Sequence, residues 1–408
     1  MNSFILPLII LLPAVLAAVT LIIPARVKGA KEALAIIGVT VNLIIAACLY
    51  GKVIEFTMPL CGFGIDFALR VYHFSAFIIL AASGFSFLTV LYSTVFMKGK
   101  AMSRQFFAYL LFTVALVNGA VLANNLVVLL FFWEGLLVTM FAMIMTGGGS
   151  AYKTSVKMLI LVGLSDLCMM LGIGMTGYIA GTLEIDKISS LPLTSWGIFA
   201  FVLLMIGAVT KAGSMPFHTW IPDAATDAPL PFMAFLPAAL EKLLGIYFLA
   251  RICLDLFDFK PGTSMSYLLM ILGSATILFA VMMALIQKDY KRLLSYHAVS
   301  QVGYMILGIG TALPVGIVGG LFHMINHAMY KSCLFYTGGA VERQAGTTDL
   351  KKLGGLGRRM PVTFTCFVIT AAAISGVPPL YGFFSKELIF DGALESGTVF
   401  YIVAALGA

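Results

Sequence analysis

Residues 209–223 place a lysine and a proline at the end of an apolar segment. Residues 197–209 contain no charged residue, and Lys211 and Pro216 follow them. Proline removes a backbone donor and clashes with the carbonyl one turn earlier, which predicts a helix break near Pro216. Broken helices at membrane depth require protein or a water-filled cavity around the freed backbone groups. The stretch therefore predicts a proton or ion path beside a titratable cation. The alternative is a lysine that snorkels from a helix end.

Lys211 is one of several charged residues within, or at the edge of, apolar segments. The full set is Lys211, Lys242, Lys331, Lys386, Glu134, Asp166, Glu241 and Glu387. A charge near the bilayer centre costs at least about 2.5–3.5 kcal/mol, so each one needs a reason. A structural ion pair is an alternative at any single position. Eight such residues favour a translocation path, in which a Glu134–Lys211 couple loads or releases a proton as its separation changes.

Two later segments extend the polar path at helical spacing. The first carries Tyr296, Ser300 and Tyr304 four residues apart, with His297 and Gln301 beside them. The second carries His323, His327 and Lys331 at the same spacing, which places them on one helix face. Histidine titrates near neutrality and is a natural proton relay between lysines. The alternative, a metal site at the two histidines, lacks the carboxylate of a zincin motif.

A second proline-rich stretch resembles the first. Pro378 and Pro379 precede Gly382 and Lys386, which again predicts a broken helix beside a lysine. One broken helix in each half of the chain fits the internal-repeat design of transporters.

Composition identifies the class of protein. Hydrophobic residues make up 61% of the chain and charged residues 11%, against about 45–50% and about 25% in soluble domains. We therefore expect an all-α polytopic membrane protein. The net charge of +7 is scattered through short loops, so no basic tract could follow a nucleic-acid backbone. The six cysteines form no CxxC, and Walker A and dinucleotide motifs are absent, so we expect no cofactor, no metal and no catalytic residue in this chain.

Apolar runs long enough to cross a bilayer recur along the chain. We expect spans near 4–24, 33–50, 74–97, 105–123, 125–146, 156–180, 196–215, 230–250, 265–287, 293–312, 314–340 and 362–377, the last continuing to 395. The first is expected to be a retained helix rather than a signal peptide. A thirteenth run starts after Gly397 and stops at Ala408, which suggests a truncated C-terminus. Residues 55–72, with Pro59, Gly62 and Gly64, predict a short hairpin at the membrane surface.

Basic residues predict the topology. Sixteen lysines and arginines fall in the odd-numbered loops and five in the even-numbered ones. Cytoplasmic loops carry the excess of positive charge. We therefore expect the odd-numbered loops in the cytoplasm and the N-terminus outside.

Five motifs together resemble a known family. They are Trp133-Glu134-Gly135, KAGSMPFHTWIPDA from Lys211, DYKRLLSYHAVSQVGY from Asp289, HMINHAMYKSCL from His323 and GVPPLYGFFSKE from Gly376. In this order they resemble the antiporter-like membrane subunits of respiratory complex I, Mrp sodium/proton antiporters and membrane-bound hydrogenase or formate hydrogenlyase complexes. The resemblance runs from about residue 70 to the end.

The resemblance implies a fold and a set of site residues. The fold is a bundle with two inverted five-helix repeats, each with a broken helix. It implies N-terminal helices in 1–100, a first repeat in 105–255 and a second, apparently cut short, in 265–408. The implied proton-translocating residues are Glu134, Asp166, Lys211, Lys242, His323, His327, Lys331 and Lys386.

This chain departs from the complex I pattern near Lys242. Phe235-Leu236-Pro237 stands where complex I members usually carry a histidine, and the acidic Glu241 follows. These departures look closer to the hydrogenase-associated branch.

The resemblance implies a proton-translocating subunit, with sodium as the alternative ion, of an NADH- or ferredoxin-linked membrane oxidoreductase. Its partners would be other membrane subunits and a peripheral redox arm. The first alternative is a subunit of an Mrp-type antiporter driven by an ion gradient alone. A solute channel would instead show a continuous polar pore.

Overall fold

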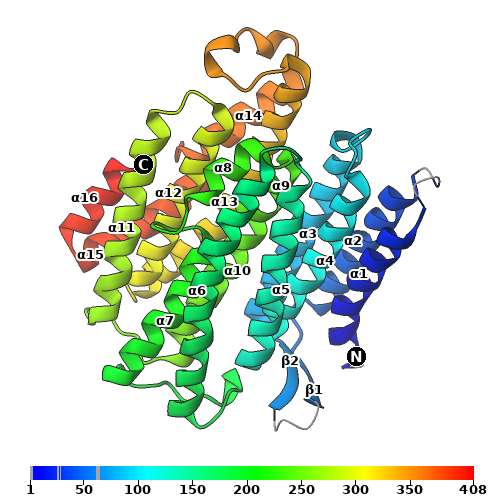
Figure 1. Cartoon of the computed structure of the whole chain (residues 1–408). Coiled ribbons are helices and arrows are strands. Elements are labelled where there is room, and N and C mark those ends of the chain that lie inside the picture. Colours follow the sequence, from blue (N-terminus) through cyan, green and yellow to red (C-terminus); the bar gives the residue numbers. More distant parts are fainter. Residues whose placement is uncertain (1–2, 25–26, 28, 61–64) are drawn as a thin grey trace. The chain divides into compact units, whose positions relative to one another are not determined.

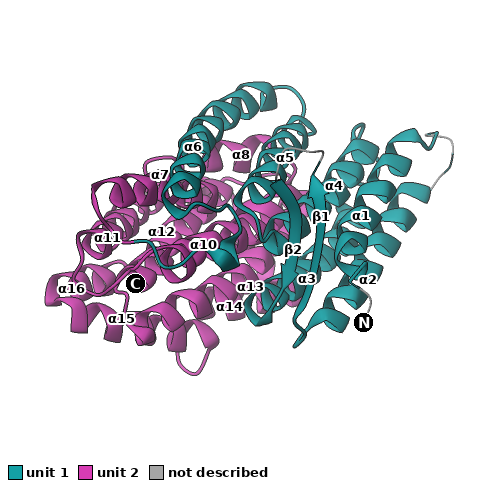
Figure 2. Ribbon diagram, turned by 90° about the horizontal axis from the view of Figure 1, so that it is seen from below, with its two compact units in different colours: residues 1–191 teal, residues 192–408 magenta. Residues whose placement is uncertain are grey.

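The chain is almost entirely helical (Figure 1). The computed structural model describes residues 3–24, 27, 29–60 and 65–408. The chain forms two compact units, residues 1–191 and 192–408, which Figure 2 shows in different colours. The predicted division into 1–100, 105–255 and 265–408 follows the inverted repeats that the family resemblance implies, and it stays a prediction.

Unit 1 is a helical bundle with one β-hairpin. Its elements are α1 (Ile5–Ile22), α2 (Ala30–Leu49), β1 (Ile54–Leu60), β2 (Ile65–Val71), α3 (His73–Phe96), α4 (Ser103–Leu122), α5 (Leu126–Met145), α6 (Ala151–Ala180) and the 3₁₀ turn η1 (Ile185–Lys187). The two strands pair antiparallel from Ile54 opposite Val71 to Leu60 opposite Ile65, which confirms the predicted hairpin. The turn glycines Gly62 and Gly64 lie outside the described residues, as do Arg26 and Lys28 of the first basic loop.

A buried amide network ties four helices of unit 1 together. Pro13 lies inside α1, so it cannot donate to the carbonyl of Ile9 one turn earlier. The Asn118 side chain on α4 donates to that carbonyl at 3.0 Å and to the side-chain oxygen of Asn42 at 2.7 Å. Asn42 on α2 in turn donates to Ser83 on α3 at 2.8 Å. One asparagine thus satisfies a carbonyl freed by proline and crosslinks the bundle.

Unit 2 contains the remaining helices. They are α7 (Ser195–Ala212), α8 (Trp220–Asp227), α9 (Leu230–Phe235), the π-turn η2 (Leu236–Leu240), α10 (Glu241–Arg251), the π-turn η3 (Ile252–Leu256), α11 (Ser264–Leu285), α12 (Tyr290–Gly310), α13 (Pro314–Ala345), the 3₁₀ turns η4 (Leu350–Lys352) and η5 (Leu356–Arg358), α14 (Pro361–Ile374), α15 (Tyr381–Ser396) and α16 (Thr398–Leu406). Segments α9 to η3 form one continuous span. Pro237 falls in its first π-turn, where a wider turn accommodates the missing donor.

Small residues bring the helices around α12 into close contact. A Cβ atom on Gly303 of α12 would lie 2.6 Å from the carbonyl oxygen of Gly273 on α11. A Cβ atom on Gly308 would lie 2.6 Å from the carbonyl oxygen of Gly316 on α13. Only glycine allows backbones to approach this closely, which is how helices pack inside membranes. Helix α12 is therefore held firmly between α11 and α13.

Both predicted helix breaks are confirmed. Helix α7 ends at Ala212, three residues earlier than expected, because Gly213 adopts a left-handed conformation with φ +85°. The span expected at 362–395 is two helices, α14 and α15, separated at the proline pair. The short helix α8 was not expected from the sequence.

The membrane-spanning character of the chain is also confirmed. Within the described residues, nine helical segments are long and apolar enough to cross a membrane. They include α1 to α7, α11 and the continuous span Leu230–Leu256. Helices α12 and α13 carry the polar and charged faces noted above, and they fall outside that set although both exceed 20 residues.

Replacing Asn118 should destabilise unit 1 through the α1 carbonyl. We expect Asn118→Leu to lower the free energy of unfolding by about 0.6–1.7 kcal/mol, the range for hydrogen bonds between membrane helices. The measurement is denaturant unfolding of the purified protein. In a Pro13→Ala background the alanine N–H can bond to Ile9, so the loss should be smaller. An equal loss in both backgrounds would mean that the Ile9 bond does not contribute.

Candidate functional site

The first helix break ends α7 with a capped turn. The amide of Gly213 donates to the carbonyl of Thr210, and that of Ser214 donates to the carbonyl of Val209, both at 2.9 Å. This pair of bonds, around a left-handed glycine, is the Schellman pattern of helix C-termini. Lys211 is buried in the last turn of α7. The break therefore lies inside the protein, next to a lysine.

Lys242 of α10 lies beside the same break. A Cβ atom on Gly213 would lie 2.8 Å from Nζ of Lys242. Gly245, one turn further along α10, allows this approach, because a Cβ atom there would lie 2.8 Å from the carbonyl oxygen of Ala208 on α7. The C-terminal end of a helix carries partial negative charge. The end of α7 is therefore a favourable environment for the buried ammonium group.

The second break repeats this local geometry. The amide of Gly376, after α14, donates to Ala373 at 3.1 Å, and the next amide, of Val377, donates to Ala372 at 3.0 Å. Gly376 has φ +77°, and a Cβ atom on it would lie 3.4 Å from Cδ of Lys386. In both breaks the peptide bond that begins two residues after the glycine is a cis bond to proline. Each broken helix thus ends at a glycine with a buried lysine beside it.

Helix α13 supplies the residues between the two lysines. His323, His327 and Lys331 are fully buried on one face of α13. The ring of His323 has a partner at each nitrogen: Oγ of Ser385 lies 2.9 Å from Nδ1, and Oε1 of Gln301 lies 3.0 Å from Nε2. Because an amide oxygen only accepts hydrogen bonds, Nε2 carries a hydrogen in this arrangement.

The hydroxyl of Ser385 can form a hydrogen bond with His323 in both protonation states of the imidazole. Its hydroxyl can donate to Nδ1 of His323, or to the carbonyl of Gly382 at 3.2 Å. When Nδ1 binds a proton, the hydroxyl can rotate to Gly382 and accept a hydrogen bond from Nδ1 instead. His323 can thus gain or lose a proton with little movement of heavy atoms.

Seven buried titratable side chains of unit 2 form a continuous series. Each member is close enough to the next for their charges to interact, in the order Lys211, Glu241, Lys242, Lys331, His327, His323 and Lys386. We call this series the Lys–His row. It runs from α7 through α10 and α13 to α15.

Several members of the row have polar atoms without a side-chain or backbone partner. Within the part of the chain that the structure describes, this holds for both carboxylate oxygens of Glu241, both ring nitrogens of His327, and Nζ of Lys242 and Lys331. Structural polar groups in protein interiors are almost always hydrogen-bonded to protein or to ordered water. The middle of the row therefore differs from an ordinary packed core.

The predicted acidic residues lie in two different environments. Asp166 of α6 is buried, and it accepts a 2.9 Å hydrogen bond from the indole of Trp133 on α5. Glu134, next to Trp133, is exposed, as is Glu387 on α15. Glu134 belongs to unit 1 and Lys211 to unit 2. The Glu134–Lys211 couple therefore stays a prediction.

The predicted site omitted three residues that the structure places in or beside the row. Glu241 is one of the eight charged residues noted in the sequence but is absent from the predicted proton-translocating set, although its charge interacts with two lysines. The hydroxyl of Tyr330 lies 3.3 Å from both Oε1 of Gln301 and Nε2 of His323. Its position seven residues after His323 could have placed it on the same helix face. The sequence carries no indication that Ser385 meets α13.

The architecture defines a class of membrane protein: a polytopic helical bundle with broken helices and buried titratable side chains. The family described as "NADH:quinone oxidoreductase/Mrp antiporter, TM" matches residues 123–408. Because this match covers more than half of the chain, the chain belongs to that family.

Three relatives are similar in sequence. One subunit of the Na(+)/H(+) antiporter of Alkalihalophilus pseudofirmus is 35% identical over 85% of this chain and 45% of its own length. A second, shorter subunit of the antiporter from the same organism is 32% identical over 82% of this chain and 68% of its own length. One subunit of a probable K(+)/H(+) antiporter of Rhizobium meliloti is 30% identical over 97% of this chain and 40% of its own length. The chain spans about half the length of the longer antiporter subunits that it matches.

Three solved structures share the fold. A chain of an archaeal membrane-bound sulfane sulfur reductase has a TM-score of 0.88 at 25% identity, covering all of this chain and 85% of that one. A chain of the Mrp complex from Dietzia sp. DQ12-45-1b has a TM-score of 0.87 at 23% identity, and the match covers 99% of this chain and 77% of that one. A chain of respiratory complex I from Thermus thermophilus has a TM-score of 0.86 at 24% identity, and the match covers 98% of this chain and 85% of that one. The predicted antiporter-like fold is confirmed, and the three scores do not separate redox complexes from antiporters.

The two glycines at the helix breaks provide a matched test of the Lys242 position. Alanine at either site adopts an unfavourable left-handed conformation. At Gly213 the new methyl group would also fall 2.5 Å from Cδ1 of Ile221 and 2.8 Å from Nζ of Lys242, so it would displace both side chains, whereas at Gly376 it makes only ordinary contact with Lys386. We expect Gly213→Ala to lower ion transport per assembled protein at least about fivefold more than Gly376→Ala. Equal effects would show that only backbone strain matters. Gly346→Ala, at an open left-handed position, controls for strain away from the row.

Proposed function

We propose that the chain is an antiporter-like subunit of a multisubunit membrane complex and that it carries protons along the Lys–His row of unit 2. The observation that carries the proposal is the pair of helix breaks, each with a buried lysine against its terminal glycine. Buried lysines of this kind are costly in a membrane and are a feature of ion pathways. The row between them consists of groups that bind and release protons.

The proposed route uses the polar atoms described above. Lys211 and Glu241 receive a proton, which passes through Lys242 and Lys331 to the histidines of α13. Water would complete the hydrogen bonds of the unpartnered groups in the middle of the row. At His323 the rotating hydroxyl of Ser385 allows Nδ1 to take up the proton and release it toward Lys386. Glu134, proposed as the acidic partner of Lys211, and Asp166 beside Trp133 would also bind and release protons.

Two sources of energy are compatible with this route. The first is electron transfer in partner subunits of an NADH- or ferredoxin-linked oxidoreductase. It is supported by the likeness to the sulfane sulfur reductase chain and by the acidic Glu241 beside Lys242. The second is an ion gradient alone, as in an Mrp-type antiporter, and the names of the sequence relatives support it. Those names include both sodium and potassium, so the counter-ion is part of the same question.

The proposed setting is a prokaryotic cytoplasmic membrane. The sixteen-to-five bias of basic residues favours odd-numbered loops in the cytoplasm and an N-terminus outside. The remaining partners would be membrane subunits of the same complex, joined by a peripheral redox arm in the first case only.

Substitutions at Lys211 separate proton transfer from structure. Arginine keeps the charge but does not give up its proton, so Lys211→Arg should lower proton transport at least about tenfold while assembly survives. Lys211→Met should also stop transport. Glu134→Gln should lower it, and Glu134→Asp should retain part of it. The measurement is proton transport per assembled complex in vesicles. A wild-type rate for Lys211→Arg would rule out a carrier role for Lys211.

The partner subunits distinguish the two energy sources. The tagged chain would be purified from its native membrane, and the same preparation would be reconstituted in liposomes. A redox complex should bring iron–sulfur or flavin subunits with it and acidify the liposomes only with an electron donor. A gradient-driven complex should contain only membrane subunits and exchange sodium or potassium for protons without a donor. Transport of neither kind would reject the proposed function.

A further inference from the structure

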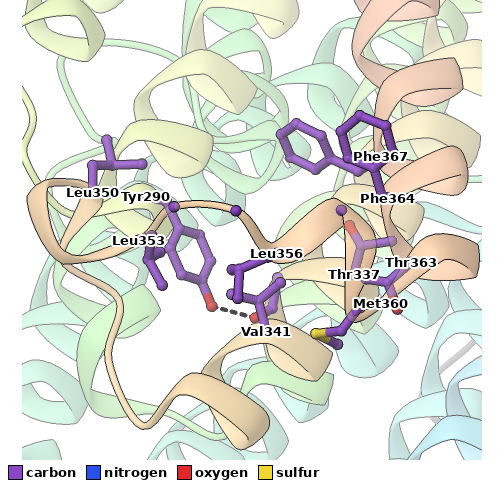
Figure 3. Close-up of a pocket in the computed structure, with 14 residues that line it drawn as sticks. Tyr290, Thr337, Val341, Leu350, Leu353, Leu356, Met360, Thr363, Phe364 and Phe367 are labelled. Atoms are coloured by element: carbon purple, nitrogen blue, oxygen red, sulfur yellow. Dashed lines mark hydrogen bonds between the residues drawn. The ribbon is translucent and has the colours of Figure 1, made fainter.

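Unit 2 contains a pocket that shares no residue with the Lys–His row. It has a volume of about 440 Å³ and lies between the end of α13, the loop 346–360 and the first turns of α14 (Figure 3). We call it the α13–α14 pocket, and its walls include Tyr290, Val341, Leu353, Leu356, Met360 and Phe364. Its size is within the range of small-molecule binding sites.

The pocket presents hydrocarbon rather than hydrogen-bonding groups. The hydroxyl of Tyr290 donates to the carbonyl of Gly338, as the dashed line in Figure 3 shows. The hydroxyl of Thr337 donates to the carbonyl of Leu334 at 3.0 Å. Both groups are therefore already satisfied within the protein. Such a lining suits an alkyl chain better than a quinone ring, whose carbonyl oxygens would need donors.

The pocket continues onto the outer surface of α14. Phe364 and Phe367 line it and are 54% and 43% exposed. Val362 and Ile369 on the same helix are 76% and 49% exposed. An exposed apolar face on a short helix of a membrane protein is a surface that lipid chains can cover. A chain lying against α14 could reach the pocket along Phe364 and Phe367, which belong to both surfaces.

Unpaired positive charge surrounds the loop that forms the pocket wall. Lys351, Lys352, Arg358 and Arg359 are exposed, and none of them forms an ion pair with any residue that the structure describes. The nearby carboxylate of Glu342 is already engaged by Lys291 at 2.9 Å. Basic clusters at the ends of membrane helices attract anionic head groups. The cluster is also held close to the pocket, because η4 and η5 carry both the basic residues and the apolar wall residues.

We propose that the α13–α14 pocket binds an anionic phospholipid, with an acyl chain between Tyr290 and Phe364 and its phosphate on Arg358 and Arg359. Three features occur together here: an apolar lining, an opening toward the exposed side of α14, and unpaired basic residues at the rim. The site is independent of the proposed proton route. It would tie the loop between α13 and α14 to the membrane surface.

The test uses the chain in its native complex, reconstituted in nanodiscs of phosphatidylcholine. The probe is a phosphatidylglycerol with a photoactivatable group at the end of one acyl chain. Irradiation should label peptides that contain residues 353–367, and unlabelled phosphatidylglycerol should compete about tenfold better than phosphatidylcholine. Equal competition by the two lipids would show ordinary solvation of α14 and overturn the proposal. Competition by a short-chain quinone at least as strong would assign the pocket to a quinone instead.

Variants separate the head-group contact from the pocket. Arg358→Gln with Arg359→Gln should abolish the preference for phosphatidylglycerol, because two charges near the membrane surface are removed. Lys98→Gln with Lys153→Gln removes two exposed charges from other odd-numbered loops and should leave labelling of 353–367 unchanged. Val341→Phe, which fills the pocket, should lower labelling while leaving the basic rim intact. Unchanged labelling in both the arginine and the Val341→Phe variants would overturn the proposal. Yield and melting temperature of each purified complex identify any variant that fails to assemble.

Discussion

A buried ammonium group needs a negative environment, and this chain supplies it with the carbonyl ends of broken helices. At the first break, Lys242 lies against Gly213, the residue at which α7 stops and where the helix end carries partial negative charge. This contact depends on the absence of a side chain at Gly213 and on the close packing of α10 at Gly245. The rest of unit 2 depends on this constraint, because α13 must bring Lys331 within reach of the charge on Lys242.

The two units treat buried polar groups in opposite ways. In unit 1, Asn118, Asn42 and Ser83 form a closed network. In it, the side chain of Asn118 donates to the carbonyl of Ile9, which Pro13 leaves without a helical donor. In unit 2, Lys331 and His327 are as deeply buried but have no hydrogen-bond partner among the described residues. Closed networks rigidify a fold, whereas incompletely satisfied ones favour hydration and exchange. This contrast supports a structural role for the first network and a transport role for the second.

The sequence predicted features that depend on one residue type at one place. Proline removes a helical hydrogen bond and glycine tolerates the left-handed conformation that ends a helix, so both breaks were predictable, and lysine in an apolar run indicates a buried charge. Contacts between distant helices were not predictable. The pairing of His323 with Ser385, 62 residues apart, depends on how α13 packs against α15. Apolar segments also do not reveal which face is covered, and for this reason the exposure of Glu134 was unexpected.

The burial of the continuous span Leu230–Leu256 has a consequence for the insertion of the protein into the membrane during synthesis. Every residue in the apolar window of this span is enclosed by the rest of the chain, and the span carries both Glu241 and Lys242. During synthesis, release of this helix from the translocon into the bilayer would be unfavourable, because the helix carries charged side chains. It is therefore expected to wait beside the translocon until α13, which follows it in the chain, arrives to cover it. The charges of Glu241 and Lys242 are thus also expected to delay the maturation of this segment.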